Sequence, residues 1–328
     1  MPRVIARRPF EQRCATAALD MNFIRLIRSS RKRRFAFVAC LLLGLPVLIG
    51  ALAIANGTIL ARGNKPEIST TTHPAATLPA VGDEITIMSF NIAKAFVHRG
   101  GFEFLEPEEV CDRLDAMADM IRRESPDLVF LSEAIRDCGP CPVNQIDYLA
   151  EKAGMHSWAF GENYNVGLPF YRVAGGNAIL SRFSISAVAN IDLPGRQPFW
   201  VTKNNRRALI GSIQIAEQEL SLVSIHNDSY SLTNNAQQAR VLLDRMAGAP
   251  AICAGDFNAG PESEPMNVFR DSGRFSGMFD GAPTFPSEKP TRRIDYILAP
   301  KSWELIQSRV IPDIVSDHLA VVTMFRVR

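Results

Sequence analysis

The chain has 328 residues, of which 47% are hydrophobic and 21% charged, which is an ordinary balance for a globular protein with a large core. Its net charge of +2 hides an asymmetry between the two ends. Residues 1–81 carry twelve Lys/Arg against three Asp/Glu, whereas residues 82–328 carry 24 against 31. An acidic body argues against a protein whose affinity comes from neutralising a polyphosphate backbone, although it is compatible with a local basic groove.

The N-terminal region has the features of a membrane-targeting segment. Residues 1–34 are basic and have no periodic apolar face, and Met21 is an alternative start. The run Arg31-Lys32-Arg33-Arg34 stands directly before residues 35–55, which contain twenty-one residues without a charge. Such a stretch is long enough to span a bilayer as a helix. The cations in front of it predict a cytoplasmic N-terminus and an exported C-terminal body.

A cleaved signal peptide is the alternative interpretation of residues 35–55. The sequences Ala51-Leu52-Ala53 and Ala53-Ile54-Ala55 resemble cleavage sites. We favour the uncleaved anchor, which predicts an inner-membrane protein with a periplasmic body; cleavage would make the protein secreted. Residues 56–82 are rich in Thr, Pro, Gly and Ala and predict a flexible, exposed linker.

From about Asp83 onwards, apolar segments with strand and helix periodicity alternate, which predicts one α/β domain over residues 83–328. The predicted strands lie at 85–90, 127–131, 177–180, 208–215, 221–225, 250–254, 294–298, 304–310 and 319–326, and the predicted helices at 107–123, 144–152 and 235–246. Residues 164–172 are expected to form a loop with candidate substrate contacts. Arg206-Arg207 is interpreted as a solvated edge rather than as a contact to an anionic substrate.

Three of the six cysteines lie in the first half of the predicted domain. Cys138-Gly139-Pro140-Cys141 has the spacing of a redox or zinc half-site, but no second pair of this kind exists, which excludes a four-cysteine zinc site. In an oxidising compartment the pattern favours a small disulfide between Cys138 and Cys141, or a bridge from one of them to Cys111.

The segment around Asp256 and Asn258 has the features of a hydrolytic site. The apolar run 251–254 ends in Gly255, and the two polar residues follow with Phe257 between them. In an extended chain, residues two apart point to the same side. One side chain is a base and the other a neutral donor and acceptor, which is the pair that a hydrolytic site needs to orient and deprotonate a water molecule. An Asx-rich turn after a core strand is the alternative.

Polar residues close most of the other predicted strands as well. Polar groups so near a core are costly unless they are paired or bind something, so their recurrence predicts a single shared site. These residues are Asn91, Glu133, Asn177, His226, Asp295, Asp317 and His318.

The motifs that carry these residues resemble those of the endonuclease/exonuclease/phosphatase superfamily of DNase-I-like, metal-dependent phosphoesterases. They occur in the family's order within residues 84–327: Ser89-Phe90-Asn91-Ile92, Leu131-Ser132-Glu133, Gly176-Asn177-Ala178-Ile179-Leu180-Ser181, Ser224-Ile225-His226-Asn227-Asp228, Gly255-Asp256-Phe257-Asn258, Arg293-Ile294-Asp295-Tyr296-Ile297 and Ser316-Asp317-His318. The resemblance implies a bacterial, membrane-anchored or exported member. It also implies a four-layer α/β/β/α sandwich, in which two mixed sheets pack face to face with helices outside.

The resemblance further implies a hydrolase of phosphoric esters that depends on a divalent metal. Glu133 corresponds to the principal metal carboxylate, with Asn91 and Asp317 near the same ion. Oxygen ligands of this kind suit Mg²⁺ or Mn²⁺, which keep several waters and bind substrate phosphate.

The remaining roles also follow from the resemblance. Asp256 would orient and deprotonate the attacking water, and Asn258 would hold that water or a phosphate oxygen. His318 would donate to a non-bridging phosphate oxygen, with Asp295 fixing its tautomer. His226 would be the second histidine at the phosphate. Asn177 would support His226 or bind the substrate phosphate.

The substrate stays open at this point, because nucleases, phospholipid or sphingolipid phosphodiesterases and sugar or inositol phosphatases share these motifs. The acidic body and the membrane segment favour a lipid or another phosphodiester over DNA or RNA as the substrate of an extracytoplasmic endonuclease. A membrane-tethered binding protein that kept the fold and lost the chemistry is the hypothesis of a different class. The complete set of site residues argues against it.

Overall fold

The computed structural model describes residues 31–53, 65–100, 103–168, 171–195, 206–215, 218–246 and 248–328. Its internal contacts divide the chain into two units, Met1–Leu52 and Ala53–Arg328. Most of the predicted basic N-terminus and the first part of the predicted linker lie outside the described residues.

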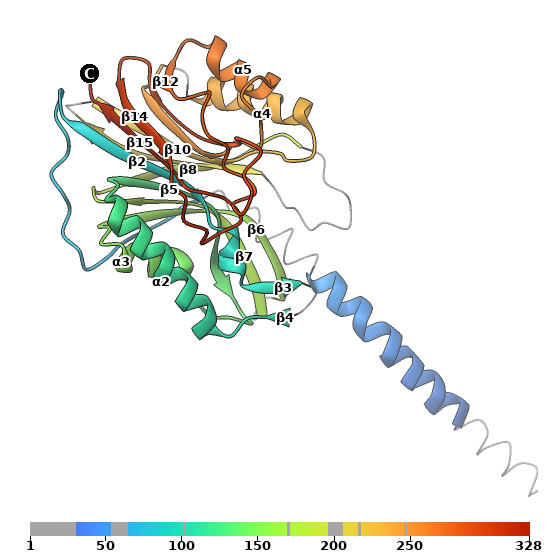
Figure 1. Ribbon diagram of the computed structural model, residues 1–328. Coiled ribbons are helices and arrows are strands. Elements are labelled where there is room, and N and C mark those ends of the chain that lie inside the picture. The colour runs from blue at the N-terminus through green and yellow to red at the C-terminus, as the bar shows by residue number, and fades with distance from the viewer. Residues whose placement is uncertain are drawn as a thin grey trace, which may run out of the picture. The chain divides into compact units, whose positions relative to one another are not determined.

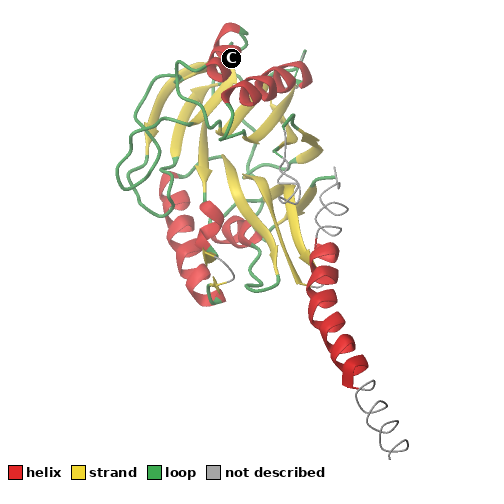
Figure 2. Cartoon of the chain, turned by 90° about the vertical axis from the view of Figure 1, so that its right-hand side faces the viewer, coloured by secondary structure: helices red, strands yellow, loops and turns green. Residues whose placement is uncertain are grey.

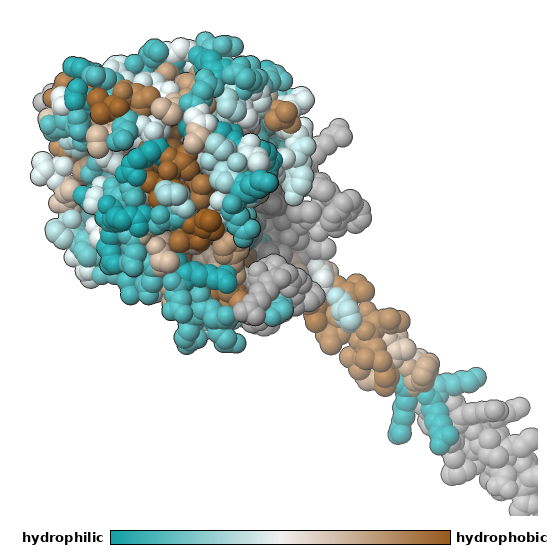
Figure 3. Space-filling model, viewed as in Figure 1, coloured by the Kyte–Doolittle hydropathy of each residue, from teal (hydrophilic) through white to brown (hydrophobic). Residues whose placement is uncertain are grey.

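The N-terminal unit contains a single described helix, Arg31–Ala53, which is long and apolar enough to cross a membrane. Hydrophilic side chains gather at its first turn and apolar ones along the rest, as expected from the basic run followed by the uncharged stretch (Figure 3). A signal sequence would have the same length and composition.

The second unit is built on two mixed β-sheets (Figure 1). The first sheet has seven strands in the order β1 (Glu67–Thr70), β6 (Ser157–Leu168), β7 (Tyr171–Ser181), β5 (Leu128–Cys138), β2 (Glu84–Asn91), β15 (Val321–Arg326) and β14 (Glu304–Val310). The second has six strands in the order β12 (Phe275–Gly277), β13 (Asp295–Pro300), β11 (Ala251–Asp256), β10 (Gln218–His226), β9 (Arg207–Ile215) and β8 (Ser186–Asp192). A short separate hairpin pairs β3 (His98–Gly100) with β4 (Glu103–Phe104).

Helices cover the outer faces of both sheets (Figures 1 and 2). The first sheet carries α2 (Pro107–Glu124) and α3 (Gln145–Lys152), and the second carries α4 (Leu232–Arg245) and α5 (Glu264–Asp271). The side chain of Asn144 accepts hydrogen bonds from the amides of Ile146 and Asp147, which caps α3 and fixes its start. The predicted four-layer α/β/β/α sandwich is confirmed.

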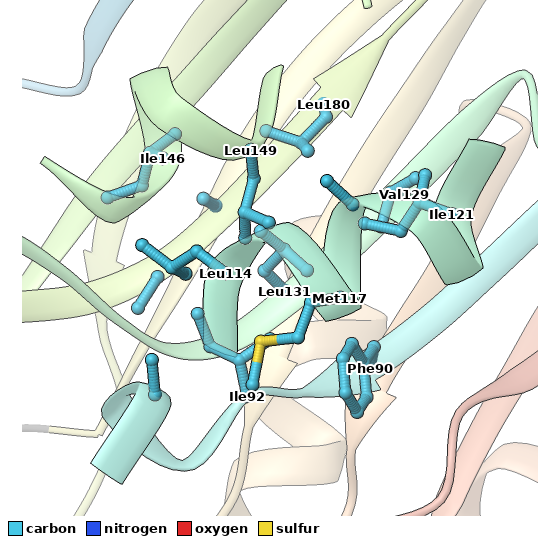
Figure 4. Packing of buried hydrophobic residues seen from close by; sticks show 14 of the residues in the cluster. Phe90, Ile92, Leu114, Met117, Ile121, Val129, Leu131, Ile146, Leu149 and Leu180 are labelled. Atoms are coloured by element: carbon cyan, nitrogen blue, oxygen red, sulfur yellow. The ribbon is translucent and has the colours of Figure 1, made fainter. Parts of the chain in front are cut away.

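Three apolar clusters hold the four layers together. The stripe of Leu114, Met117 and Ile121 on α2 packs on Val129 and its neighbours in the first sheet (Figure 4). A second cluster, with Ile87, Phe130, Leu222 and Ile297 among its members, lies between the two sheets. The third cluster joins α4 and α5 to the second sheet. The strands around the core between the sheets are largely apolar, and Asn91, His226 and Asp256 are polar residues that stand at strand ends.

Four residues within the predicted flexible linker over residues 56–82 form a strand. Residues 67–70 form strand β1, which pairs antiparallel with residues 157–160 of β6. Glu67 also forms an ion pair with Arg136, at 2.6 Å. The strand was not predicted because its four residues bury little apolar surface, so its position depends on the unpaired edge of β6.

Two further expectations are corrected by the structure. Residues 164–172 were expected to form a loop, but residues 164–168 belong to β6 and residues 171–172 to β7, and these two strands pair antiparallel. The predicted disulfide is also wrong for this structure, because Cys111, Cys138 and Cys141 are free. The turn after β5 is closed instead by a backbone hydrogen bond from the amide of Cys141 to the carbonyl of Cys138, at 3.2 Å. Burial raises the pKa of Cys141 to about 11, which keeps this thiol protonated.

Candidate active site

The candidate site lies where strands from both sheets end at the same edge. In the first sheet, β2 and β5 run parallel, and Asn91 at the end of β2 is paired with Ser132, the residue before Glu133. In the second sheet, β10 and β11 run parallel, and His226 is paired with Asp256 at their ends. Asp256 is also paired with Asp295 across β11 and β13. The register therefore brings residues from five distant motifs together.

Side chains from the two sheets meet at Asp256 and Glu133. The Nδ2 atom of Asn91 is 3.1 Å from Oδ2 of Asp256 and 3.5 Å from Oε1 of Glu133. The Nε2 atom of His226 is 3.4 Å from the same Asp256 oxygen and 3.8 Å from the same Glu133 oxygen. The two carboxylates thus lie on either side of one amide and one imidazole, within reach of a single phosphoryl group.

His318 is oriented by a buried carboxylate, as the motifs imply. Its Nδ1 atom donates to Oδ2 of Asp295 at 2.9 Å, and the hydroxyl of Thr284 donates to the same oxygen at 2.6 Å. This bond leaves Nε2 of His318 facing Asp256, 3.8 Å from its Oδ2 atom. Burial lowers the pKa of His318, but Asp295 and Asp256 together raise it to about 9. The imidazole is therefore protonated at neutral pH and can donate to an anion.

Asp256 has the properties of a general base. Its side chain is 2% exposed. Burial and the nearby charge of Asp295 raise its pKa to about 7, against the opposing effect of His318. A carboxylate with a pKa near the working pH is suited to take a proton from water.

Glu133 has the opposite electrostatic environment. Burial acts to raise its pKa, but electrostatic interactions with His226, Lys94 and Arg206 and the hydrogen bond from Lys94 lower the pKa to about 2. The Lys94 ammonium forms an ion pair with Oε2 of Glu133. The side chain of Glu133 is 24% exposed and faces the pocket. Its carboxylate offers the oxygen donors that a hard divalent cation prefers, and the Lys94 ammonium beside it shows that this position attracts a cation. The Asn91 amide turns its Nδ2 atom toward this carboxylate, while its Oδ1 atom accepts a hydrogen bond from the amide of Ala93 at 3.0 Å.

A second group of candidate metal ligands lies beside this one. Asp256, Asp295 and His318 are all buried, and they place ligand atoms within 4.8 Å of one another. Asp295 and His318 are already bonded to each other, so an ion between them would break the bond that orients the imidazole. We therefore interpret this group as a proton-handling unit rather than as a metal centre.

The other expected residues have different positions around the pocket. Asp317 is exposed and lines the same hollow as Glu133. The backbone amide of Asn258 donates to Oδ1 of Asp256 at 2.9 Å, which fixes the orientation of the base, and its side chain also lines the pocket. Asn177 is fully buried behind the pocket. Its amide donates to the carbonyls of Arg207 and Ser224, at 2.9 and 3.3 Å, so it supports the strand that carries His226.

Two residues of the pocket, Lys94 and Arg292, were not identified from the sequence. The hollow has a volume of about 480 Å³. Its lining also includes Tyr164, which was expected as a candidate substrate contact, and Arg206, for which the interpretation as a solvated edge is wrong. The guanidinium of Arg206 donates to Ser229 at 3.2 Å, whereas Arg207 is 1% exposed and pairs with Asp192. Neighbouring residues in an extended segment point to opposite sides, and this alternation could have separated the two arginines.

Comparison with known proteins agrees with this geometry. A family model described as "Endonuclease/Exonuclease/phosphatase family" matches residues 88–318, which is well over half of the chain and includes Asn91, Glu133, Asp256 and His318. The chain belongs to this family. Members of the endonuclease/exonuclease/phosphatase family are phosphoric ester hydrolases that in general depend on a divalent metal, and the chain is an enzyme of this class. No curated protein matches the sequence.

Solved structures show that the fold is shared at low sequence identity. An endonuclease/exonuclease/phosphatase from Beutenbergia cavernae is 22% identical, with a TM-score of 0.56, and the match covers 74% of this chain and 72% of that one. The mannosyl-6-phosphatase of Bacteroides thetaiotaomicron is 17% identical, with a TM-score of 0.55 and coverages of 74% and 99%. TDP2 of D. rerio, solved with a single-strand DNA product, is 18% identical, with a TM-score of 0.52 and coverages of 74% and 98%.

Proposed function

We propose that the enzyme hydrolyses a phosphoric diester in one in-line displacement, with Asp256 as the general base. The observation that carries this proposal is the position of Asp256. It is a buried carboxylate with a pKa of about 7, it lies within 4 Å of both His226 and His318, and it shares the Asn91 amide with Glu133. A base, anion-binding groups and a second carboxylate thus surround one hollow.

The contacts of the residues support the following proposed roles. Asp256 takes a proton from the attacking water. At the same time the water oxygen forms a bond to phosphorus, and the bond between phosphorus and the ester oxygen breaks. His318 donates from Nε2 to a non-bridging phosphate oxygen, and Asp295 keeps its other nitrogen protonated. His226 and Asn258 contact the phosphate or the water. Burial lowers the pKa of His226, which makes it a neutral donor at this position.

Glu133 and Asn91, with Asp317 at the rim, would hold a Mg²⁺ or Mn²⁺ ion. Such an ion, when bound, supplies a Lewis acid that neutralises charge on the phosphoryl oxygens and the leaving oxygen. The low pKa of Glu133 supports this assignment, because the ligand is ionised over the whole working range of pH.

We favour a phosphodiester with a non-nucleic-acid alcohol as the substrate. Residues 82–328 carry seven more acidic than basic side chains, which does not suit a polyanion. An extracytoplasmic endonuclease of DNA or RNA is the alternative, and the likeness to TDP2 with its DNA product gives it some support. A catalytically inactive binding protein would not need the full set of base, imidazoles and carboxylate.

The proposal is tested by the pH dependence of bis-p-nitrophenyl phosphate hydrolysis with Mg²⁺ or Mn²⁺. Activity requires Asp256 ionised and His318 protonated, so kcat/KM should rise through a pH of about 7 and fall through about 9. Asp295 raises both pKa values, so both limbs should move to lower pH in Asp295→Asn. Limbs that stay in place in this variant, or the absence of hydrolysis at every pH, would refute the assignment.

We also propose that the helix Arg31–Ala53 anchors the enzyme in the bacterial inner membrane, with its N-terminus cytoplasmic and its catalytic domain periplasmic. The arginines and lysine before the apolar stretch support this orientation. After expression of the full chain, membrane fractionation should leave the protein in the pellet through a high-salt wash. A soluble product whose N-terminus lies near Ala55 would instead show that the segment is a cleaved signal and that the enzyme is secreted.

A further inference from the structure

A second hollow lies beside the catalytic pocket, and it is the larger of the two. Its volume is about 970 Å³, against about 480 Å³ for the catalytic pocket. It lies between α2, the loop 286–289 and the segment 314–317 that precedes His318. Figure 3 shows a patch of apolar side chains bordered by hydrophilic ones on the face of the domain seen in Figure 1. Exposed apolar hollows of this size are typical of ligand sites.

The two hollows share their dividing wall. Asp317 lines both of them. The turn η1 (Ala93–Phe96) contributes Lys94 to the catalytic pocket and Phe96 to the second hollow. In the same way, Phe285 lines the catalytic pocket and Pro286 the second hollow. The two hollows are therefore neighbours across Asp317 and the segments 94–96 and 285–286.

Hydrogen bonds and a cation–π contact hold the wall between the two hollows in place. The hydroxyl of Ser316 donates to the carbonyl of Asn91 at 2.8 Å, and the amide of Ser287 donates to the carbonyl of Asp317 at 2.8 Å. The guanidinium of Arg113 lies 5.4 Å from the centre of the Phe96 ring. This contact covers one side of the ring and fixes its pose, and the residue is still 38% exposed.

The lining of the second hollow is apolar at the centre and nearly neutral at the rim. Phe96 and Ile314, the latter 59% exposed, present apolar surface together with Pro286 and Val315. The charged lining residues are three carboxylates and two cations, namely Asp112, Glu288, Asp317, Arg113 and Lys289. A chain of further phosphates would meet a slight excess of negative charge there, so the lining does not suit a polyanion. An uncharged apolar group is complementary to it.

We propose that this hollow is a subsite for an apolar alcohol moiety of the substrate, an alkyl or acyl chain carried by the phosphate that the catalytic pocket binds. Phe96 and Ile314 are its specificity-determining residues. The inference rests on the proposed function, which it narrows to phosphoric esters with an apolar alcohol. The same chemistry is offered by a lipid in a bilayer and by a short-chain ester in solution.

The test uses the full-length, metal-loaded protein, purified in nanodiscs without detergent. The ligands are n-alkyl phosphates from methyl to octyl. Binding is measured by calorimetry, and inhibition of bis-p-nitrophenyl phosphate hydrolysis is measured in parallel. Each methylene that enters the hollow should lower Kd about twofold to fourfold, as expected for apolar surface removed from water. A Kd that is independent of chain length would overturn the proposal.

Substitutions in the second hollow test whether it causes the dependence of Kd on chain length. In Phe96→Ser and Ile314→Ser, the dependence of Kd on chain length should be strongly reduced, while the Kd of methyl phosphate stays the same. The Phe96→Leu variant should keep most of the dependence of Kd on chain length. Ile306→Ser is the matched control, because Ile306 is 37% exposed on β14 and lines neither hollow. Both serine variants remove partly exposed side chains, so thermal melting should show a folded domain. An unchanged chain-length dependence in both variants would overturn the assignment of the subsite.

The remaining arms separate the possible outcomes. If binding depends on chain length but no hydrolysis occurs, the proposed function is refuted and the apolar subsite is supported. If hydrolysis occurs but binding does not depend on chain length, the apolar subsite is refuted and the proposed function is supported. A dinucleotide that binds more tightly than octyl phosphate would contradict the apolar subsite. Comparison of a dihexanoyl phospholipid in solution with its long-chain counterpart in vesicles shows whether the apolar group is supplied from water or from a membrane.

Discussion

Replacing Asp256 by Asn should lower kcat for bis-p-nitrophenyl phosphate by at least about 10²-fold, the low end of what a general base contributes. The amide keeps the shape of the side chain and can keep its contacts to the Asn258 amide and to His226, but it cannot accept the proton of the attacking water. The KM should change little, because the metal carboxylate and the imidazoles stay in place. Steady-state kinetics at the pH optimum of the wild type measures both values.

The control for this variant is Asp271→Asn, which removes a carboxylate from the exposed end of α5. It should retain wild-type kinetics. If Asp256→Asn turns over at the wild-type rate, Asp256 is not the base and the proposed mechanism is wrong. A loss of folding would be visible in the melting temperature, and it would leave the KM undefined rather than unchanged.

Chelation should reduce activity to the background level, and Glu133→Gln should raise the metal concentration needed for half-maximal activity by at least about tenfold, the lower end of the effect of removing a group that supports a metal site. Gln keeps an oxygen donor but has no negative charge, whereas the Glu133 carboxyl group of the wild type has a pKa of about 2 and is therefore ionised. Titration of the apo-enzyme with Mg²⁺ and with Mn²⁺ measures the shift.

Glu219→Gln is the matched control, because Glu219 is exposed near the start of β10, the strand that carries His226 at its other end. Its metal titration should coincide with that of the wild type. A Glu133→Gln enzyme with a wild-type metal titration would show that the ion binds elsewhere, and the buried group of Asp256, Asp295 and His318 would then be the next candidate.

The candidate site residues could be selected from the sequence because each of them stands at the end of an apolar run. Asn91, His226 and Asp256 close strands whose side chains are otherwise buried, and a polar group at such a place is costly unless it has a partner. Periodicity predicted many of the strands and helices, but not β6, β8 or α5, and the order of the motifs predicted the family. The long amphipathic helix α2 was predicted almost to its ends, because its apolar residues recur at helical spacing.

The features missed by the sequence analysis depend on neighbours that are distant in the chain. Strand β1 exists because β6 offers it an edge, and Lys94 reaches Glu133 through a left-handed turn in which Ala93 to Phe96 all have positive φ. Non-glycine residues adopt this conformation at a cost, so nothing in their local sequence predicts it. Glu133 itself has a φ of 58° beside a register shift between β5 and β7, which turns its side chain toward the pocket.

The amino-acid sequence by itself determined an α/β domain, the membrane-length helix and the list of chemical groups, because periodicity and the cost of burying polar atoms act locally. The four layers were implied by the resemblance to the family. The tertiary structure alone decided which of these groups act together. Burial alone would raise the pKa of Asp256 and lower that of His318. The Asp295 carboxylate, which the fold places beside both residues, raises the pKa of each, to about 7 and about 9. The apolar hollow beside the catalytic pocket likewise exists only after residues 96, 286 and 314 have been brought together by the fold.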